Sequence, residues 1–252
     1  AADTGIYGRL YDSSGSPVTG ELRLNDTTAD NQGRPRIASR DGGYVVSWTS
    51  QLQDGSGAAA VVRLLDGDAA PVGGEIVVNE TTAGDQSAPD VAALADGTLG
   101  VVWRSDGQDG SEGGIYGRIL ADNGAPLSGE FLVNTWTTGD QKNPRIAPDG
   151  AGGFIAVWTS VGQVEAEDTY ARRFDAAGVP VGAALRVHAF TARNQDMPNV
   201  AGAAGRPLMV TWRDEQAPGG SARDVVAQRF GIGLFTDGFE SGDSSAWTVT
   251  FP

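Results

Sequence analysis

The chain alternates short apolar runs with polar, glycine-rich segments, and the same order of runs returns about every 54 residues. The most apolar run of each period ends in tryptophan, as in YVVSWTS, LGVVWRS, FIAVWTS and LMVTWRD. These tryptophans recur at intervals of 55, 55 and 54 residues, at Trp48, Trp103, Trp158 and Trp212. A fixed period of this length predicts one structural unit repeated along the chain.

Each period contains four runs with the length and residue types of β-strands. They are represented by GELRLN, PRIAS, YVVSW and IYGRLYD. Proline at the start of the second run is compatible with a strand, because the missing ladder donor does least harm there. The IYGRLYD run alternates large and polar residues, which predicts the outer, half-solvated strand of a sheet. No segment carries an apolar stripe at helical spacing, so we predict an all-β fold.

Four antiparallel strands per period predict one blade of a β-propeller. We therefore predict a propeller of four repeats over residues 1–233, followed by a tail over residues 234–252. The IYGRLYD run occurs five times and the other runs four times, which predicts 17 strands, one more than four closed blades need. In a closed ring, either the first copy (Ile6–Asp12) or the last copy (Val225–Phe230) would be left without a partner.

Two side chains recur with the strands and are predicted to be structural. The tryptophans are expected to pack between neighbouring blades, because each can bury a large apolar surface there. A glutamine follows each Thr-rich loop, in NQGRP, DQSAP, DQKNP and NQDMP, and is expected to satisfy buried amides between blades. These glutamines are Gln32, Gln86, Gln141 and Gln195. The Thr-rich loops themselves are either turns held by their own side chains or ligand loops displayed once per blade.

Composition and charge narrow the function classes. The net charge is −14 and the pI is near 4.3, so nucleic acid and anionic membranes would be repelled. No apolar run approaches the roughly 18 residues of a membrane-spanning helix.

The absence of cysteine excludes thiol catalysis, thiolate metal sites and disulfides. This composition is typical of a secreted or cell-surface protein, and the first residues, AADTG, suit removal of a leader peptide or a cut within a longer repeat array.

The sequence offers few side chains that could act as catalytic acids, bases or nucleophiles. The only histidine, His188, stands where other copies have Asn25, Asn79 and Asn134, so it is better explained as a structural substitution than as a general base. Without it there is no Ser-His-Asp arrangement and no histidine metal cluster. A glycosidase needs only two carboxylates, but no Asp or Glu is found to break the repeat pattern as a single-use active site would. The sequence therefore predicts no catalytic residue and no enzyme.

A calcium site is the one cofactor that the sequence offers. The segment SDGQDGSEGG places Asp106, Asp109 and Glu112 around glycines, and these hard oxygen ligands suit calcium. The segment lacks the fixed ligand order of a strong calcium loop, and the other copies lose ligands. The alternative is a solvated hairpin turn.

The motif order QDGSG-x-GIYGxR, GxPxGxEFxVN, DQxxP and W resembles tandem repeats of large secreted and surface proteins of bacteria. The resemblance covers about residues 6–230 and is best from Gln108 to Trp158. It implies an extracellular, propeller-like, non-catalytic module with no catalytic residues to carry over. The segment from Leu234, which contains DGFESGD, resembles the C-termini of some secreted gammaproteobacterial proteins.

The main hypothesis is a non-catalytic structural or adhesive protein that assembles with copies of itself or with other surface proteins into a filament or surface layer. A terminal strand would make the contact, with either an end of the propeller or the tail donating it. The residues expected there are Ile6, Tyr7, Trp247, Val249 and Phe251. The alternative is that the tail lies along its own domain.

Two other functions remain open at this stage. One is a glycan-binding lectin, in which Trp136 or Phe190 stacks on a sugar beside Asp and Asn. The other is a glycoside-acting enzyme, which needs a pair of carboxylates.

Overall fold

The computed structural model describes residues 4–163, 166–189, 193–203, 207–215 and 224–230. These residues form antiparallel β-strands, and none of them is helical, so the predicted all-β class is confirmed. Within the same residues there is accordingly no helix of the length and apolarity that crossing a bilayer requires. The predicted tail, residues 234–252, lies outside the described residues.

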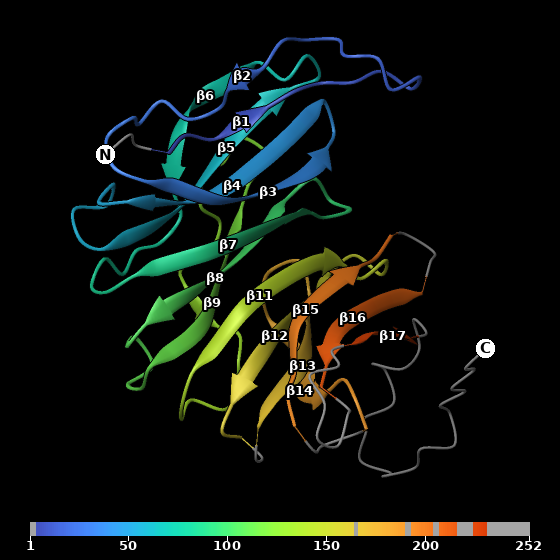
Figure 1. The fold of residues 1–252 in the computed structure, drawn as a ribbon. Coiled ribbons are helices and arrows are strands. Elements are labelled where there is room, and N and C mark those ends of the chain that lie inside the picture. The colour runs from blue at the N-terminus through green and yellow to red at the C-terminus, as the bar shows by residue number, and fades with distance from the viewer. Residues whose placement is uncertain (1–3, 164–165, 190–192, 204–206, 216–223, 231–252) are drawn as a thin grey trace.

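The strands form five sheets that follow one another along the chain (Figure 1). The first is a pair, β1 (Tyr7–Gly8) and β2 (Leu22–Arg23). The second contains β3 (Gln32–Arg40), β4 (Gly43–Gln51), β5 (Ala58–Asp66) and β6 (Pro71–Val77). The third contains β7 (Gln86–Ala93), β8 (Leu99–Asp106), β9 (Gly113–Leu120) and β10 (Phe131–Leu132). The fourth contains β11 (Gln141–Pro148), β12 (Phe154–Val161), β13 (Glu167–Phe174) and β14 (Pro180–Arg186), and the fifth contains β15 (Gln195–Ala201), β16 (Leu208–Asp214) and β17 (Asp224–Phe230).

The strand order corrects the prediction for the outer strand. In every four-stranded sheet the proline run is first, the tryptophan run second, the IYGRLYD relative third and the GELRLN relative last. Strand β5, a relative of IYGRLYD, is buried over almost its whole length, whereas β6 is exposed over its first four residues. The polar member of the run, Arg63, does not face solvent, because its Nη1 donates to the Leu24 carbonyl of the preceding sheet at 2.6 Å. The alternation therefore reflects contacts between sheets.

The proline runs β3, β7, β11 and β15 lie next to one another at the inner side of the sheets, and each contacts the next in the series. This placement of sheets around inner strands is propeller-like (Figure 1). The described sheets do not complete four closed blades of four strands. The first IYGRLYD copy pairs with β2 in a sheet of its own, and the last copy, β17, pairs with β16 in a three-stranded sheet.

The hydrophobic core consists of four clusters, and each cluster joins two neighbouring sheets. One repeated tryptophan belongs to each cluster. Trp103, for example, packs with Val45 and Val62 of the preceding sheet. The repeated tryptophans are 0–4 % exposed. Apolar burial of this kind supplies the main stabilisation of a cysteine-free fold.

Candidate functional site

The four inner strands surround one depression of about 650 Å³, which we call the axial depression. Its walls are built from the same segment of each repeat, which begins directly after the proline of the proline run in β3, β7 and β11 and directly before it in β15. The lining residues are Arg36–Ser39, Asp90–Ala93, Arg145–Pro148 and Met197–Gly202. Because the walls come from equivalent positions, differences between the repeats at these positions decide the chemistry of the depression.

A β-bulge precedes the depression in every inner strand. The strand register shifts between Gly33 and Arg36 in β3, and at the equivalent place in β7, β11 and β15. At each bulge the residue before the proline has a positive φ of 50–56°, at Arg34, Ala88, Asn143 and Met197. Bulges bend a strand and re-aim its side chains, and they are frequent beside active sites.

Neighbouring sheets hold two of these bulges. The Ala88 amide donates to the Thr49 hydroxyl at 2.9 Å, and the Met197 amide donates to the Thr159 hydroxyl at 3.2 Å. Each threonine directly follows a repeated tryptophan. The contact between sheets therefore also fixes the backbone that carries the axial side chains.

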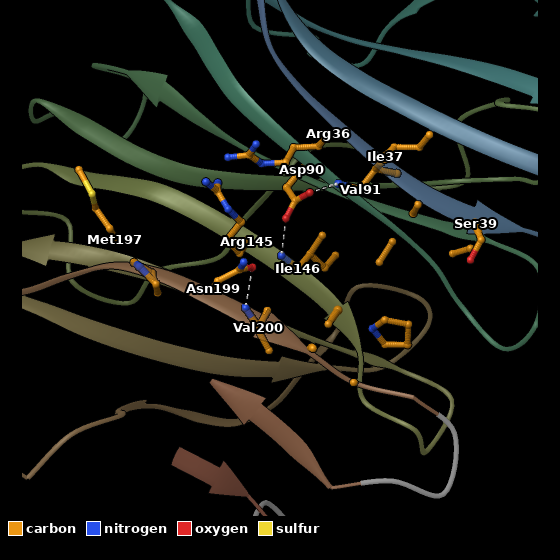
Figure 2. A pocket seen from close by; sticks show the side chains of 18 residues that line it. Arg36, Ile37, Ser39, Asp90, Val91, Arg145, Ile146, Met197, Asn199 and Val200 are labelled. Carbon is orange, nitrogen blue, oxygen red and sulfur yellow. Dashed lines mark hydrogen bonds between the residues drawn. The ribbon is translucent and has the colours of Figure 1, made fainter. Parts of the chain in front are cut away.

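The residue directly after the proline differs from repeat to repeat. It is Arg36 in β3, Asp90 in β7, Arg145 in β11 and Asn199 in β15. All four line the axial depression (Figure 2). Two cations, one acid and one amide thus converge from positions that the repeat makes equivalent.

The Asp90 carboxyl group is held rigidly in this wall. It is 9 % exposed, its Oδ1 accepts a hydrogen bond from the Val91 amide at 3.0 Å, and its Oδ2 accepts one from the Ile146 amide of β11 at 3.1 Å (Figure 2). Burial raises the pKa of Asp90 above its usual value, against the opposing effects of the Ile146 amide and the charges of Arg145 and Arg36. A buried carboxyl with a raised pKa can retain its proton and give it to a substrate.

Arg36 and Arg145 extend to the same side of Asp90 (Figure 2). With Arg34, Ala88, Pro89 and Asn143 they line a second hollow of about 330 Å³, which we call the arginine pocket. Burial, together with the charges of Arg36 and Arg34, lowers the pKa of Arg145. The three arginines line the same pocket, so their positive charges disfavour one another there.

Sequence reasoning missed this site, and the statement that no acid breaks the repeat pattern is wrong. Asp90 stands in PDVAAL where β3 and β11 have arginine in PRIAS and PRIAP. The signal was available as a single-residue difference at an equivalent position. Its importance could not be recognised from the sequence, because only the fold shows that the position of Asp90 faces the axial depression.

The predicted structural residues lie away from the axial depression. The side chains of the four glutamines are buried, and in two copies the glutamine bonds the tryptophan of the same sheet. Trp103 Nε1 donates to Gln86 Oε1 at 3.2 Å, while Gln86 Nε2 donates to the Ala83 carbonyl of the Thr-rich loop at 3.1 Å. These hydrogen bonds lie within one sheet, whereas the tryptophan rings pack between sheets.

His188 takes the hydrogen-bonding role of the asparagine that it replaces. In the third repeat Asn134 Oδ1 accepts from the Ile115 amide at 2.6 Å, and in the fourth His188 Nε2 accepts from the Thr169 amide at 3.2 Å. The separation in sequence is 19 residues in both cases. His188 does not line the axial depression.

The residues predicted to bind ligands or neighbours are scattered. Trp136 is 38 % exposed in the loop after β10, and it lines neither cavity. Ile6 is buried, whereas Tyr7 is 59 % exposed on β1. The other predicted residues of these kinds lie outside the described residues, and they are Phe190, Trp247, Val249 and Phe251.

The predicted calcium ligands do not converge in the part of the chain that the structure describes, where no three carboxylate or imidazole side chains gather as a metal set. Asp106 pairs with Arg104, and Asp109 Oδ1 accepts from the Ser111 amide at 3.2 Å. The latter contact is typical of a turn stabilised by its own side chain.

No family model matches the chain, and no curated protein matches it. Among solved structures, it is similar to a protein of unknown function from Dyadobacter fermentans, with a TM-score of 0.64 and 9 % identity over 94 % of this chain and 71 % of that one. It is also similar to an endo-arabinase from Bacteroides thetaiotaomicron, with a TM-score of 0.53 and 15 % identity over 94 % and 96 % of the two chains. A third similar structure is the GH93 α-L-arabinofuranosidase of Fusarium graminearum with arabinobiose, with a TM-score of 0.56 and 14 % identity over 79 % and 57 %. Likeness at these identities shows a shared fold.

The comparisons contradict the prediction of a non-catalytic structural or adhesive protein that assembles through a terminal strand. They also contradict the prediction that the protein is not an enzyme, because the shared fold is one on which an endo-arabinase and an arabinofuranosidase are built. The physical reason for the error is the repeat itself. Because most positions repeat, the prediction found no acid that breaks the pattern, whereas Asp90 stands at a position at which the repeats differ.

Proposed function

We propose that the protein is a glycoside-acting enzyme whose substrate binds in the axial depression. The observation that carries this proposal is Asp90, a buried acid at a position where the flanking repeats have arginine. The fold shared with an endo-arabinase and an α-L-arabinofuranosidase supports the same class of substrate. An extracellular location and a glycan partner are part of this proposal.

Asp90 is assigned the role of proton donor. Hydrolysis breaks the bond between the anomeric carbon and the leaving oxygen, which takes up a proton, and forms a new bond between the anomeric carbon and water. A carboxyl group with a raised pKa can supply that proton near neutral pH. Asp90 is the only carboxylate among the described residues that line the two cavities, so these residues supply the acid of the usual carboxylate pair and not its base or nucleophile. The assignment therefore rests on one group, and its replacement should remove acid catalysis altogether.

The test compares the full chain with Asp90→Asn on a panel of neutral and acidic polysaccharides, with new reducing ends as the readout. We expect Asp90→Asn to reduce kcat/KM by about 10²–10⁴-fold, the usual contribution of a general acid. Asp96→Asn is the matched control, because Asp96 lies on the turn after β7 and accepts from the Thr98 amide away from the depression. Thermal unfolding of both variants establishes that they are folded.

The pH profile gives a second readout of the same role. Because the donor must be protonated, activity should fall as pH rises through the raised pKa of Asp90. Cleavage that is unchanged in Asp90→Asn would contradict the assignment. Glycan binding without any cleavage across the panel would contradict the enzymatic function.

We also propose that the repeat of about 54 residues is the blade unit of a four-repeat propeller. The three four-stranded sheets support this, because each contains the four runs of one period in the same spatial order. Within the blade, the first strand supplies the axial residue and the second supplies the tryptophan.

A further inference from the structure

We infer that the arginine pocket binds the anionic group of an acidic sugar, so that the substrate is a glycan bearing a carboxylate or a sulfate ester. This inference rests on the proposed function, because it names the substrate class of the same site. It comes from three arginines that the rest of the molecule leaves available.

The pairing of the arginines is uneven across the chain. Five described arginines have carboxylate partners within 4.0 Å, and these are Arg63, Arg104, Arg118, Arg173 and Arg213. Among the described residues, no carboxylate oxygen lies within that distance of Arg34, Arg36 or Arg145. In a protein of net charge −14, three arginines that share one pocket without an acidic partner form a positive site on an acidic molecule.

The contacts of the two inner arginines hold them in place and leave donors free. Arg36 Nη1 donates to the Pro35 carbonyl at 3.2 Å, and Arg145 Nη1 donates to the Pro144 carbonyl at 2.6 Å. Each side chain is thus anchored to the proline of its own bulge, and a guanidinium has five N–H donors in all. The remaining donors are available to an anion that lies between β3 and β11.

Asp90 is compatible with an anion in this position. Its oxygens are engaged by the Val91 and Ile146 amides instead of by the arginines. Burial also favours its neutral form, which leaves the charge of the arginines uncompensated. Charge-assisted bonds to a carboxylate or a sulfate are stronger than bonds between neutral groups, and arginine forms them with a defined geometry.

The geometry also relates the anionic group to the reaction. Arg36 and Arg145 line both the arginine pocket and the axial depression, and Asp90 lies in the wall between their strands. A sugar that places its anion against the arginines would bring the neighbouring glycosidic oxygen towards the Asp90 carboxyl. The arginines are therefore specificity residues and Asp90 is the group that acts on the bond.

The experiment is isothermal titration calorimetry of the full chain with three oligosaccharides of equal length. One is an oligogalacturonate, one is a sulfated galactan fragment and one is a neutral galactan fragment. We expect at least one acidic oligosaccharide to bind about tenfold or more tightly than the neutral one, with an affinity that falls as salt is added. The relative affinities of the two acidic ligands decide between carboxylate and sulfate.

The variants Arg36→Gln and Arg145→Gln should each weaken acidic binding by about tenfold or more and weaken any neutral binding much less. Arg40→Gln is the matched control, because it removes the same charge from the same strand, and Arg40 lines neither cavity. Thermal unfolding checks that each variant is folded.

The outcomes separate this inference from the proposed function. Cleavage of neutral glycans with no preference for acidic ones would overturn the inference while the enzymatic function stands. Arginine-dependent binding of acidic glycans without cleavage would support the inference and overturn the enzymatic function. Acidic binding that is equal in Arg36→Gln, Arg145→Gln and Arg40→Gln would show that the arginine pocket is not the site.

Discussion

The tryptophan between the sheets and the residue after the axial proline belong to the same repeat, but they have diverged to different extents. The first is tryptophan in all four copies, whereas the second is arginine in two copies, aspartate in one and asparagine in one. The tryptophan ring fills space between two sheets, so any replacement disturbs both. The axial side chain faces a depression, so its replacement changes chemistry more than packing. Residues that are the same in all four repeats therefore belong to the scaffold of this molecule, and residues that differ between repeats line its candidate site.

The largest expected effect is at the constant position. Trp103→Ala should lower the free energy of unfolding by about 3–5 kcal/mol, because it leaves a cavity between two sheets. Urea denaturation measures the change. The matched control is Trp136→Ala, which removes a ring that is 38 % exposed and should cost less than about 1 kcal/mol. Equal losses in the two variants would show that the scaffold does not depend on the buried ring.

A smaller effect is expected at the glutamine that bonds the tryptophan. Gln86→Leu should cost about 1–3 kcal/mol, because it leaves the buried Trp103 Nε1–H without its acceptor. Adding Trp103→Phe removes the donor as well, so the double variant should lose less than the sum of the two single variants. Denaturation of all four proteins gives the coupling energy. Simple additivity would contradict a role for the hydrogen bond.

At the axial position the expected effect on stability is about 1 kcal/mol, and its sign depends on pH. Folding raises the pKa of Asp90 from its usual 3.8, so the stability from its protonated form is complete below that value and is lost as pH rises through the raised pKa. Asp90→Asn cannot ionise. Its free energy of unfolding relative to the unaltered protein should therefore increase as pH rises through that range.

Urea denaturation of the two proteins at a series of pH values from acidic to neutral measures this difference. Asp96→Asn again serves as the control, since Asp96 is exposed on a turn. A stability difference that stays constant with pH, or that moves in the opposite direction, would contradict the effect of burial on Asp90.

The smallest effect is expected where one copy departs from a constant position but keeps the acceptor contact to the backbone, although His188 Nε2 also lies 3.3 Å from Asp168 Oδ1. His188→Asn should alter stability by less than about 1 kcal/mol, because asparagine makes the same acceptor contact in the other repeats. The reverse change, Asn134→His, places a larger ring in a site shaped for asparagine and should cost more. Thermal unfolding compares the two. A larger loss in His188→Asn would show that the histidine has a role of its own.

Much of the fold could be predicted from the sequence, because the repeat itself marks the strands. Every occurrence of the tryptophan run became the second strand of a sheet, and His188 took the place of the repeated asparagine. The position of the IYGRLYD run was not predictable from its alternation. Its arginines look like solvent-facing residues in a sequence, but Arg63 and Arg118 reach carbonyl groups of the preceding sheet.

The candidate site was less accessible to sequence reasoning for a different physical reason. Arg36, Asp90 and Arg145 are far apart in the chain, and each is an ordinary strand residue in its own repeat. They come together only because the inner strands of successive sheets lie next to one another. The difference between PRIAS and PDVAAL was visible, but nothing local shows which of the many differences between repeats face the axis.

The bulge before each axial proline divides the inner strand into a part that supports the core and a part that lines the axial depression. Upstream of it the strand contributes a buried glutamine, and downstream it presents a side chain to the depression. In β7 and β15 a threonine of the neighbouring sheet holds the bulge between them. The four residues that follow the axial prolines thus differ between repeats, whereas the buried glutamines and tryptophans that support them are the same. A combinatorial library limited to Arg36, Asp90, Arg145 and Asn199 could sample new ligand chemistries without redesigning the core, and the axis of this protein is a natural place to graft them.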